Sequence, residues 1–192
     1  MAAEKTPAGK PGDQKSKPAK PQISKLEAQK RAMMAKMVAA SFGEVVTLMM
    51  RTPRYRKMPI EALEASAAAP VALGQVAIAE AQSKANGATM PVAAVLWAKV
   101  SPEVDRRLSD TQNETTALAV NEWRSGDIPW IIEAIGERKA LGTLLHQLMG
   151  TAFKSTPPKM RTTGADGRPT VGRLERVENQ DQAQAKPADG KA

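Results

Sequence analysis

The stretch from residue 123 to residue 135 constrains the fold of this chain most strongly. It reads Trp-Arg-Ser-Gly-Asp-Ile-Pro-Trp-Ile-Ile-Glu-Ala-Ile. Ser125, Gly126 and Asp127 predict a turn, because glycine tolerates backbone angles that other residues avoid and serine and aspartate can bond their own backbone. The part from Trp130 to Ile135 is β-branched or aromatic apart from one glutamate and one alanine, which predicts a short buried strand. The sequence therefore places a carboxylate inside an apolar strand.

Glu133 is the one charged residue of that strand. Because side chains alternate along a strand, we expect Glu133 to point away from Ile132 and Ala134 and to the same side as Ile131 and Ile135. If other elements cover that side, loss of solvent raises the pKa of the carboxyl. The alternative is a solvated sheet face, since buried carboxylates are rare unless they have a partner or a function.

Composition limits the sites that the chain can build. Its 192 residues predict one domain with tails, and a hydrophobic content of 42% is enough for one core. Cysteine is absent, which excludes a disulfide framework and a cysteine-ligated metal, and His146 is the one histidine, so we expect no metal site. The net charge of +8 suits an acidic protein partner as well as nucleic acid.

The two ends differ in composition from the middle. Residues 1–23 are mainly Lys, Pro, Ala and Gly, and residues 178–192 are mainly Gln, Ala, Asp and Lys, so we expect disordered tails around one domain at 24–177. The basic first tail could attach weakly to acidic partners or lipid surfaces, or serve solubility alone. We find no secretory signal and no run of roughly 18 apolar residues, which predicts a cytoplasmic protein without a membrane span.

Hydrophobic periodicity and turn signals predict an α+β chain. Ser24 and Glu27 form a capping-box pattern at the start of the first helix, which is expected to end near Met50. The further elements are a helix at 60–69 ended by Pro70, strands at 71–81 and 91–100 around the Asn86-Gly87 turn, short helices at 101–108 and 117–123, the strand described above, a helix at 137–153, and a hairpin of strands 159–163 and 170–177. This order predicts a mostly antiparallel sheet flanked by helices.

Two prolines bracket a strongly basic loop at residues 53–59. The loop holds Arg54, Arg56 and Lys57, together with Tyr55, which is the one tyrosine of the chain. A tyrosine between two arginines on a loop fixed by prolines is well placed to meet an anionic group. The alternative is a solvated basic connector.

Four segments in order resemble the RTX toxin-activating lysine acyltransferases, the hemolysin-activating family. They are residues 43–59, Pro91-Val92-Ala93 with Trp97-Ala98-Lys99-Val100-Ser101, the Trp-x-Ser-Gly-Asp-x-x-Trp pattern from Trp123 to Trp130, and Thr170-Val171-Gly172-Arg173-Leu174. Each motif is weak alone, but the four together, at nearly the family's spacing, cover roughly residues 41–176.

The resemblance implies a fold of the Gcn5-related N-acyltransferase type. It also implies transfer of a fatty acyl group from acyl carrier protein to a lysine of a toxin-like protein. The donor is then the acyl carrier protein thioester, and no bound cofactor is expected. The resemblance to this family also suggests that the protein forms a homodimer.

The sequence departs from the family at its catalytic positions. The family is held to use a histidine in the loop and an aspartate after the second tryptophan, where this chain has Tyr55 and Glu133. Acylation of lysine needs a base for the amine and a proton for the leaving thiolate. A tyrosine with a pKa of about 10 is a poor base at pH 7 but a reasonable acid. We therefore expect Glu133 as base and Tyr55 as acid, with Arg54, Arg56 and Lys57 meeting the acidic carrier protein.

Two other classes of function stay open at this point. A non-catalytic descendant of the family would bind acyl carriers or another protein, because loss of catalytic residues commonly removes the chemistry. A basic nucleic-acid-associated protein would fit the charge, but aromatic residues make up 3% of the chain, which is few for base stacking.

Overall fold

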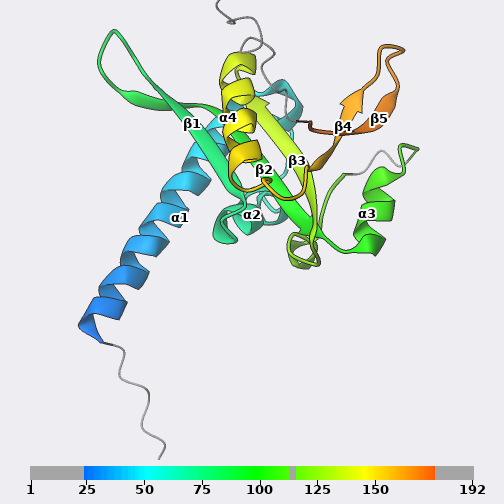
Figure 1. Ribbon diagram of the computed structural model, residues 1–192. Helices are drawn as coiled ribbons and strands as arrows, with labels where there is room; N and C mark the ends of the chain where they lie inside the picture. Colours follow the sequence, from blue (N-terminus) through cyan, green and yellow to red (C-terminus); the bar gives the residue numbers. More distant parts are fainter. Residues whose placement is uncertain (1–23, 113–115, 176–192) are drawn as a thin grey trace, which may run out of the picture.

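The computed structural model describes residues 24–112 and 116–175 (Figure 1). The two expected tails, at 1–23 and 178–192, lie outside the described residues, as do residues 113–115 of the expected loop and the end of the last expected strand.

Five strands form one sheet in the described part, in the order β1-β2-β3-β4-β5. They are β1 (Val76–Gln82), β2 (Thr89–Val100), β3 (Ile128–Gly136), β4 (Lys159–Thr163) and β5 (Pro169–Arg173). Neighbouring strands are antiparallel except β3 and β4, which are parallel. The predicted α+β fold with a mostly antiparallel sheet is confirmed, and it is consistent with the Gcn5-related acyltransferase type.

Helices cover both faces of the sheet. The four α-helices of the described residues are α1 (Lys25–Arg51), α2 (Ala69–Ala72), α3 (Pro102–Ser109) and α4 (Arg138–Gly150). On one face, the second half of α1 packs Val45 and Leu48 into a core that also holds Trp123 and Trp130. On the other face α4 crosses the sheet, with Leu144, Leu148, Met149 and Phe153 forming a second core (Figure 1).

Several predicted boundaries are confirmed because local chemistry decides them. Ser24 accepts a hydrogen bond from the Glu27 amide, and the Glu27 carboxylate accepts one from the Ser24 amide, so α1 begins with a complete capping box. Gly87 has φ +70 in the turn between β1 and β2, a conformation that suits glycine. Ser101 caps α3.

The predicted helix at 60–69 and the strand expected to follow it are wrong in detail. A π-helix spans Glu64–Ala68 and runs on into α2, so Pro70 lies near the start of a helix and does not end one. The continuous helix accommodates Pro70, although proline has no N–H and cannot donate the hydrogen bond that another residue would make at this position. The strand begins at Val76 in place of Val71.

The predicted helix at 117–123 is a single 3-10 turn, Val120–Glu122. The segment is too short to form a stable α-helix by itself, because short helices depend on tertiary packing for their stability.

A β-bulge in β3 breaks the alternation that the sequence analysis assumed. Leu96 pairs with Glu133 and Trp97 pairs with Ile131, which leaves Ile132 as an extra residue in β3. Ile131 belongs to the core under α4, whereas Ile132 packs against the core under α1.

The expected orientation of Glu133 is therefore half wrong. Ile132 and Glu133 line the same cavity, and Ile131 lies on the opposite face. The extra residue at the bulge turns two successive side chains to one side. The expected grouping with Ile135 holds, since Ile135 belongs to the core under α1.

The sheet opens next to this bulge. The parallel pairing of β3 with β4 consists of Trp130 with Lys159 and Ile131 with Met160. Beyond these pairs the β4–β5 hairpin turns away from β3 (Figure 1). The bulge at Ile132 therefore sits directly beyond the last β3–β4 pair.

Among the described helices, α1 is long and apolar enough to cross a membrane by length and composition. The prediction from the sequence rests on an unbroken run of apolar residues, and Lys36 and Glu44 interrupt the apolar residues of this helix. Val45, Leu48 and Met49 of its second half are buried in the core, and 17% of its apolar window is buried in total.

Candidate active site

Tyr55 and Glu133 lie together, although they are far apart in sequence. Tyr55 ends the 3-10 turn Pro53–Tyr55 that follows α1, and Glu133 lies at the bulge of β3. Arg54 joins them: its Nη2 donates to the hydroxyl of Tyr55 and to Oε2 of Glu133. The guanidinium carbon of Arg54 is 4.6 Å from the centroid of the Tyr55 ring, a cation–π contact.

The three side chains differ in their exposure to solvent. Tyr55 is buried, the Glu133 side chain is 18% exposed, and the Arg54 side chain is 58% exposed. The pair thus lies under the surface, and the arginine covers it from the solvent side.

Burial shifts the acid–base behaviour of both groups. It raises the pKa of the Glu133 carboxyl, against the opposing effects of the hydrogen bond from Tyr55 and the charge of Arg54. It also raises the pKa of the Tyr55 hydroxyl far above its usual value, and the charge of Glu133 adds to that rise. Glu133 is therefore a stronger base than an exposed glutamate, while Tyr55 stays protonated at physiological pH.

The basic residues of the loop differ in their contacts. Arg54 contacts the buried pair, whereas Arg56 and Lys57 are exposed. The structure thus separates Arg54 from the other two residues that the sequence analysis assigned to carrier binding. Its place beside Glu133 depends on how the end of α1 sits over β3, for which the sequence carried no signal.

A cavity of about 230 Å³ opens beside Glu133. Glu133 is the one charged residue among the described residues that line it, and most of the others are small or apolar: Met58, Ala62, Ala65, Ala117, Leu118, Trp123 and Ile132. An apolar cavity with a partly buried carboxylate in its wall suits an alkyl chain whose reactive end lies at that carboxylate.

Trp123 closes part of this cavity through a hydrogen bond that the π-helix makes available. The amide of Ala69 donates to the carbonyl of Glu64, five residues back. The next bond of this kind would run from residue 70 to the carbonyl of Ala65, but Pro70 has no N–H. The indole Nε1 of Trp123 donates to that carbonyl instead, at 2.8 Å.

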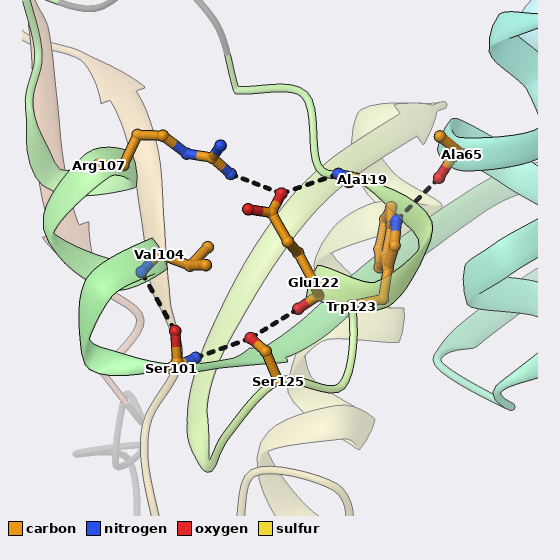
Figure 2. A network of polar contacts seen from close by, with 8 residues as sticks. All are labelled: Ala65, Ser101, Val104, Arg107, Ala119, Glu122, Trp123 and Ser125. Atoms are coloured by element: carbon orange, nitrogen blue, oxygen red, sulfur yellow. Dashed lines mark hydrogen bonds and ion pairs between the residues drawn. The ribbon is translucent and has the colours of Figure 1, made fainter.

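The Ser-Gly part of the sequence motif joins β3 to the end of β2 (Figure 2). The hydroxyl of Ser125 accepts a hydrogen bond from the amide of Ser101 at 2.9 Å and donates to the carbonyl of Glu122 at 3.0 Å. A Cβ at Gly126 would lie 2.5 Å from the carbonyl oxygen of Val100, so only glycine fits. These contacts position the start of β3 and not a substrate.

Glu122 continues this network (Figure 2). Its Oε2 accepts from Nη2 of Arg107 at 2.7 Å and from the amide of Ala119 at 2.8 Å. These two contacts connect residues 117–123, some of which line the cavity beside Glu133, to α3.

The other motif residues also make packing contacts. The indole Nε1 of Trp130 donates to Oδ1 of Asp105 at 2.7 Å, and Asp105 also pairs with Lys159 at 2.7 Å. Trp97 packs its ring edge-on to another aromatic ring of the second core, with 5.8 Å between centroids. Asp127 is exposed.

In the part of the chain that the structure describes, no group of three or more His, Cys, Asp or Glu side chains could hold a metal ion. His146 is exposed on α4, on the opposite side of the sheet from Tyr55 and Glu133.

Comparison with known protein families matches the part of the chain that holds these residues. The model of the RTX toxin acyltransferase family matches residues 34–178, which include the Tyr55 loop, the strand of Glu133 and the motif from Trp123 to Trp130. The comparison with curated proteins gave no significant match. Because the family model covers most of the chain, the protein belongs to the RTX toxin acyltransferase family.

Proposed function

We propose that this protein transfers a fatty acyl group from acyl carrier protein to a lysine of a toxin-like protein, with Glu133 as base and Tyr55 as acid. The observation that carries the proposal is that Glu133, which Arg54 bridges to the buried Tyr55, lines an apolar cavity in a member of an acyltransferase family.

The reaction moves one acyl group and one proton. The lysine Nζ attacks the thioester carbonyl carbon and forms the new C–N bond, while the Glu133 carboxylate takes a proton from the amine. Collapse of the tetrahedral intermediate breaks the C–S bond and releases the thiolate of the carrier. A raised carboxyl pKa helps the first step, because a base is most effective when its pKa lies near the working pH.

Tyr55 completes the proton balance. Its hydroxyl donates a proton to the leaving thiolate, and protonated Glu133 returns a proton to the phenol oxygen. The raised pKa of Tyr55 disfavours a free phenolate at this site, which favours coupling of the two transfers. The products are an amide and a thiol, and both side chains recover their starting states.

Arg54 supplies positive charge beside Tyr55 and Glu133. It is more than half exposed, so its guanidinium can turn from Glu133 toward the oxyanion of the tetrahedral intermediate. Arg56 and Lys57 stay available for an acidic carrier protein on the outer side of the loop.

The cavity beside Glu133 supports an acyl chain as the transferred group. At about 230 Å³ it is smaller than the roughly 300 Å³ at which small-molecule pockets begin. We therefore expect it to hold part of a fatty acyl chain, with the rest outside.

A second candidate is a non-catalytic binding protein derived from the same family. The ion pair of Arg54 with Glu133 favours it, because that contact occupies the carboxylate that the reaction needs. In this case the cavity would bind the acyl chain of a carrier protein without transfer.

One experiment separates the two candidates. The full-length protein is mixed with acyl carrier protein carrying a C14 or C16 chain and with a pool of lysine peptides, and the masses of carrier and peptides are followed. Peptide acylation that disappears in Glu133→Gln and Tyr55→Phe, and persists in the exposed control His146→Gln, supports the enzyme. A stable thioester with carrier binding supports the binding protein. A stable thioester without carrier binding contradicts both.

A further inference from the structure

The first half of α1 presents large apolar side chains to solvent. Leu26, Met33, Met34 and Met37 are 60, 68, 63 and 60% exposed. Figure 1 shows this half of the helix extending away from the sheet. Exposed apolar side chains gathered on one element indicate an interaction surface, because single ones are ordinary and clustered ones are not.

Three of these side chains form one stripe. Leu26, Met33 and Met37 are spaced by seven and four residues, which places them on the same side of a helix. We name Leu26, Met33 and Met37 the apolar stripe of α1.

Basic residues accompany the stripe. Lys25, Lys30, Arg31 and Lys36 lie in the same half of the helix, against one acidic residue, Glu27. By sequence, residues 1–37 carry nine basic and three acidic residues, so they hold +6 of the net charge of +8. The apolar stripe therefore lies at the most basic part of the chain.

The family match does not account for this part of the helix. It begins at residue 34, so most of the stripe and its basic neighbours lie before it or at its edge. By contrast, Tyr55, Glu133 and the cavity lie well inside the matched region.

This half of α1 is too short to cross a bilayer. Residues 25–37 span about 20 Å as a helix, and the hydrocarbon core is about 30 Å thick. The rest of the helix is held in the domain, where Val45, Leu48 and Met49 are buried. A helix with an apolar stripe and flanking lysines fits a position in the interface of a membrane.

We propose that the first half of α1, residues 25–37, binds the surface of an anionic lipid bilayer. The apolar stripe enters the boundary between headgroups and acyl chains, and Lys30 and Lys36, which flank it on the helix, meet the lipid phosphates. Nucleic acid fits this surface less well, because its backbone is contacted by charged and polar groups and offers no partner to three large apolar side chains.

The test is flotation of the full-length protein with vesicles of phosphatidylcholine alone or mixed with phosphatidylglycerol. We expect binding to the mixed vesicles that weakens as salt rises. The double variant Met33→Glu/Met37→Glu should reduce it by about tenfold or more, because it removes apolar burial and adds negative charge. The control Ile60→Glu makes the same kind of change at an apolar residue that is exposed elsewhere and should bind like the wild type.

Three results would overturn the proposal. They are no flotation with the mixed vesicles, binding that the double variant leaves unchanged, and a wild-type oligomer that the double variant converts to monomers. The last result would assign the stripe to a second copy of the chain. The assay is independent of acyl transfer, so its outcome does not depend on the function proposed above.

Discussion

Glu133 accepts a hydrogen bond from Arg54, a residue of the loop after α1, and the same Nη2 atom donates to Tyr55. The candidate base is thus held by a cation that the sequence analysis assigned to carrier docking. Two opposing effects therefore act on the pKa of Glu133: burial raises it, and the nearby charge of Arg54 lowers it.

Replacing Arg54 by glutamine should change how acyl transfer depends on pH. Loss of the cation removes the effect that lowers the pKa of Glu133, so this pKa rises further. Because the base must be deprotonated, the acidic limb of the profile of kcat/KM should move to higher pH. The profile of Arg56→Gln, an exposed neighbour, serves as control and should keep its position. An unmoved limb in Arg54→Gln would mean that Glu133 is not the titrating base.

Glu133→Gln should also reveal the cost of burying the carboxylate. The pKa of Glu133 is raised in the folded state, so its protonated form is favoured there, and the wild type loses stability as pH rises from the unfolded pKa through the folded pKa. Glutamine does not titrate, so the variant escapes this loss. Urea unfolding at pH 4 and pH 7 should show the stability of the variant relative to the wild type increasing with pH. A constant difference would contradict the raised pKa.

Substitutions of Trp123 and Pro70 should have effects on the unfolding free energy that are not additive, because both residues affect the hydrogen bond to the Ala65 carbonyl. Trp123→Phe leaves the Ala65 carbonyl without its indole donor and should cost about 1–3 kcal/mol of unfolding free energy. In the double variant with Pro70→Ala, residue 70 regains an N–H that can donate to this carbonyl, so the loss should be smaller than the sum of the two single losses. Strictly additive losses in urea unfolding would show that Pro70 does not free this carbonyl.

Filling the cavity should change which acyl chains are accepted. Ala62→Leu and Ala65→Leu add methylene groups to its wall next to Glu133, so the ratio of kcat/KM for long over short acyl chains should fall, by about tenfold for each variant. Ala88→Leu, in the exposed turn between β1 and β2, is the matched control and should keep the ratio. An equal loss of activity with all chain lengths would indicate damage to the fold, and an unchanged ratio would place the acyl chain elsewhere.

Much of the fold could be predicted from the sequence because local chemistry decides it. Three local features involve only a few residues each, so they can be predicted without knowledge of the sheet. They are the capping box of Ser24 and Glu27, the Asn86-Gly87 turn and the Ser101 cap. The motif from Trp123 to Trp130, with its companions, was enough to identify the family.

The sequence by itself thus determined the order of the elements, the family and the pair of residues at the candidate site. The tertiary structure alone decided which way those residues face. The bulge at Ile132 depends on the register between β2 and β3 and turns Glu133 into the cavity beside Ile132. Arg54 reaches Glu133 because of how α1 packs on the sheet. Such contacts join residues distant in the chain, so no local pattern encodes them, and the pKa shifts that follow from them arise only on burial.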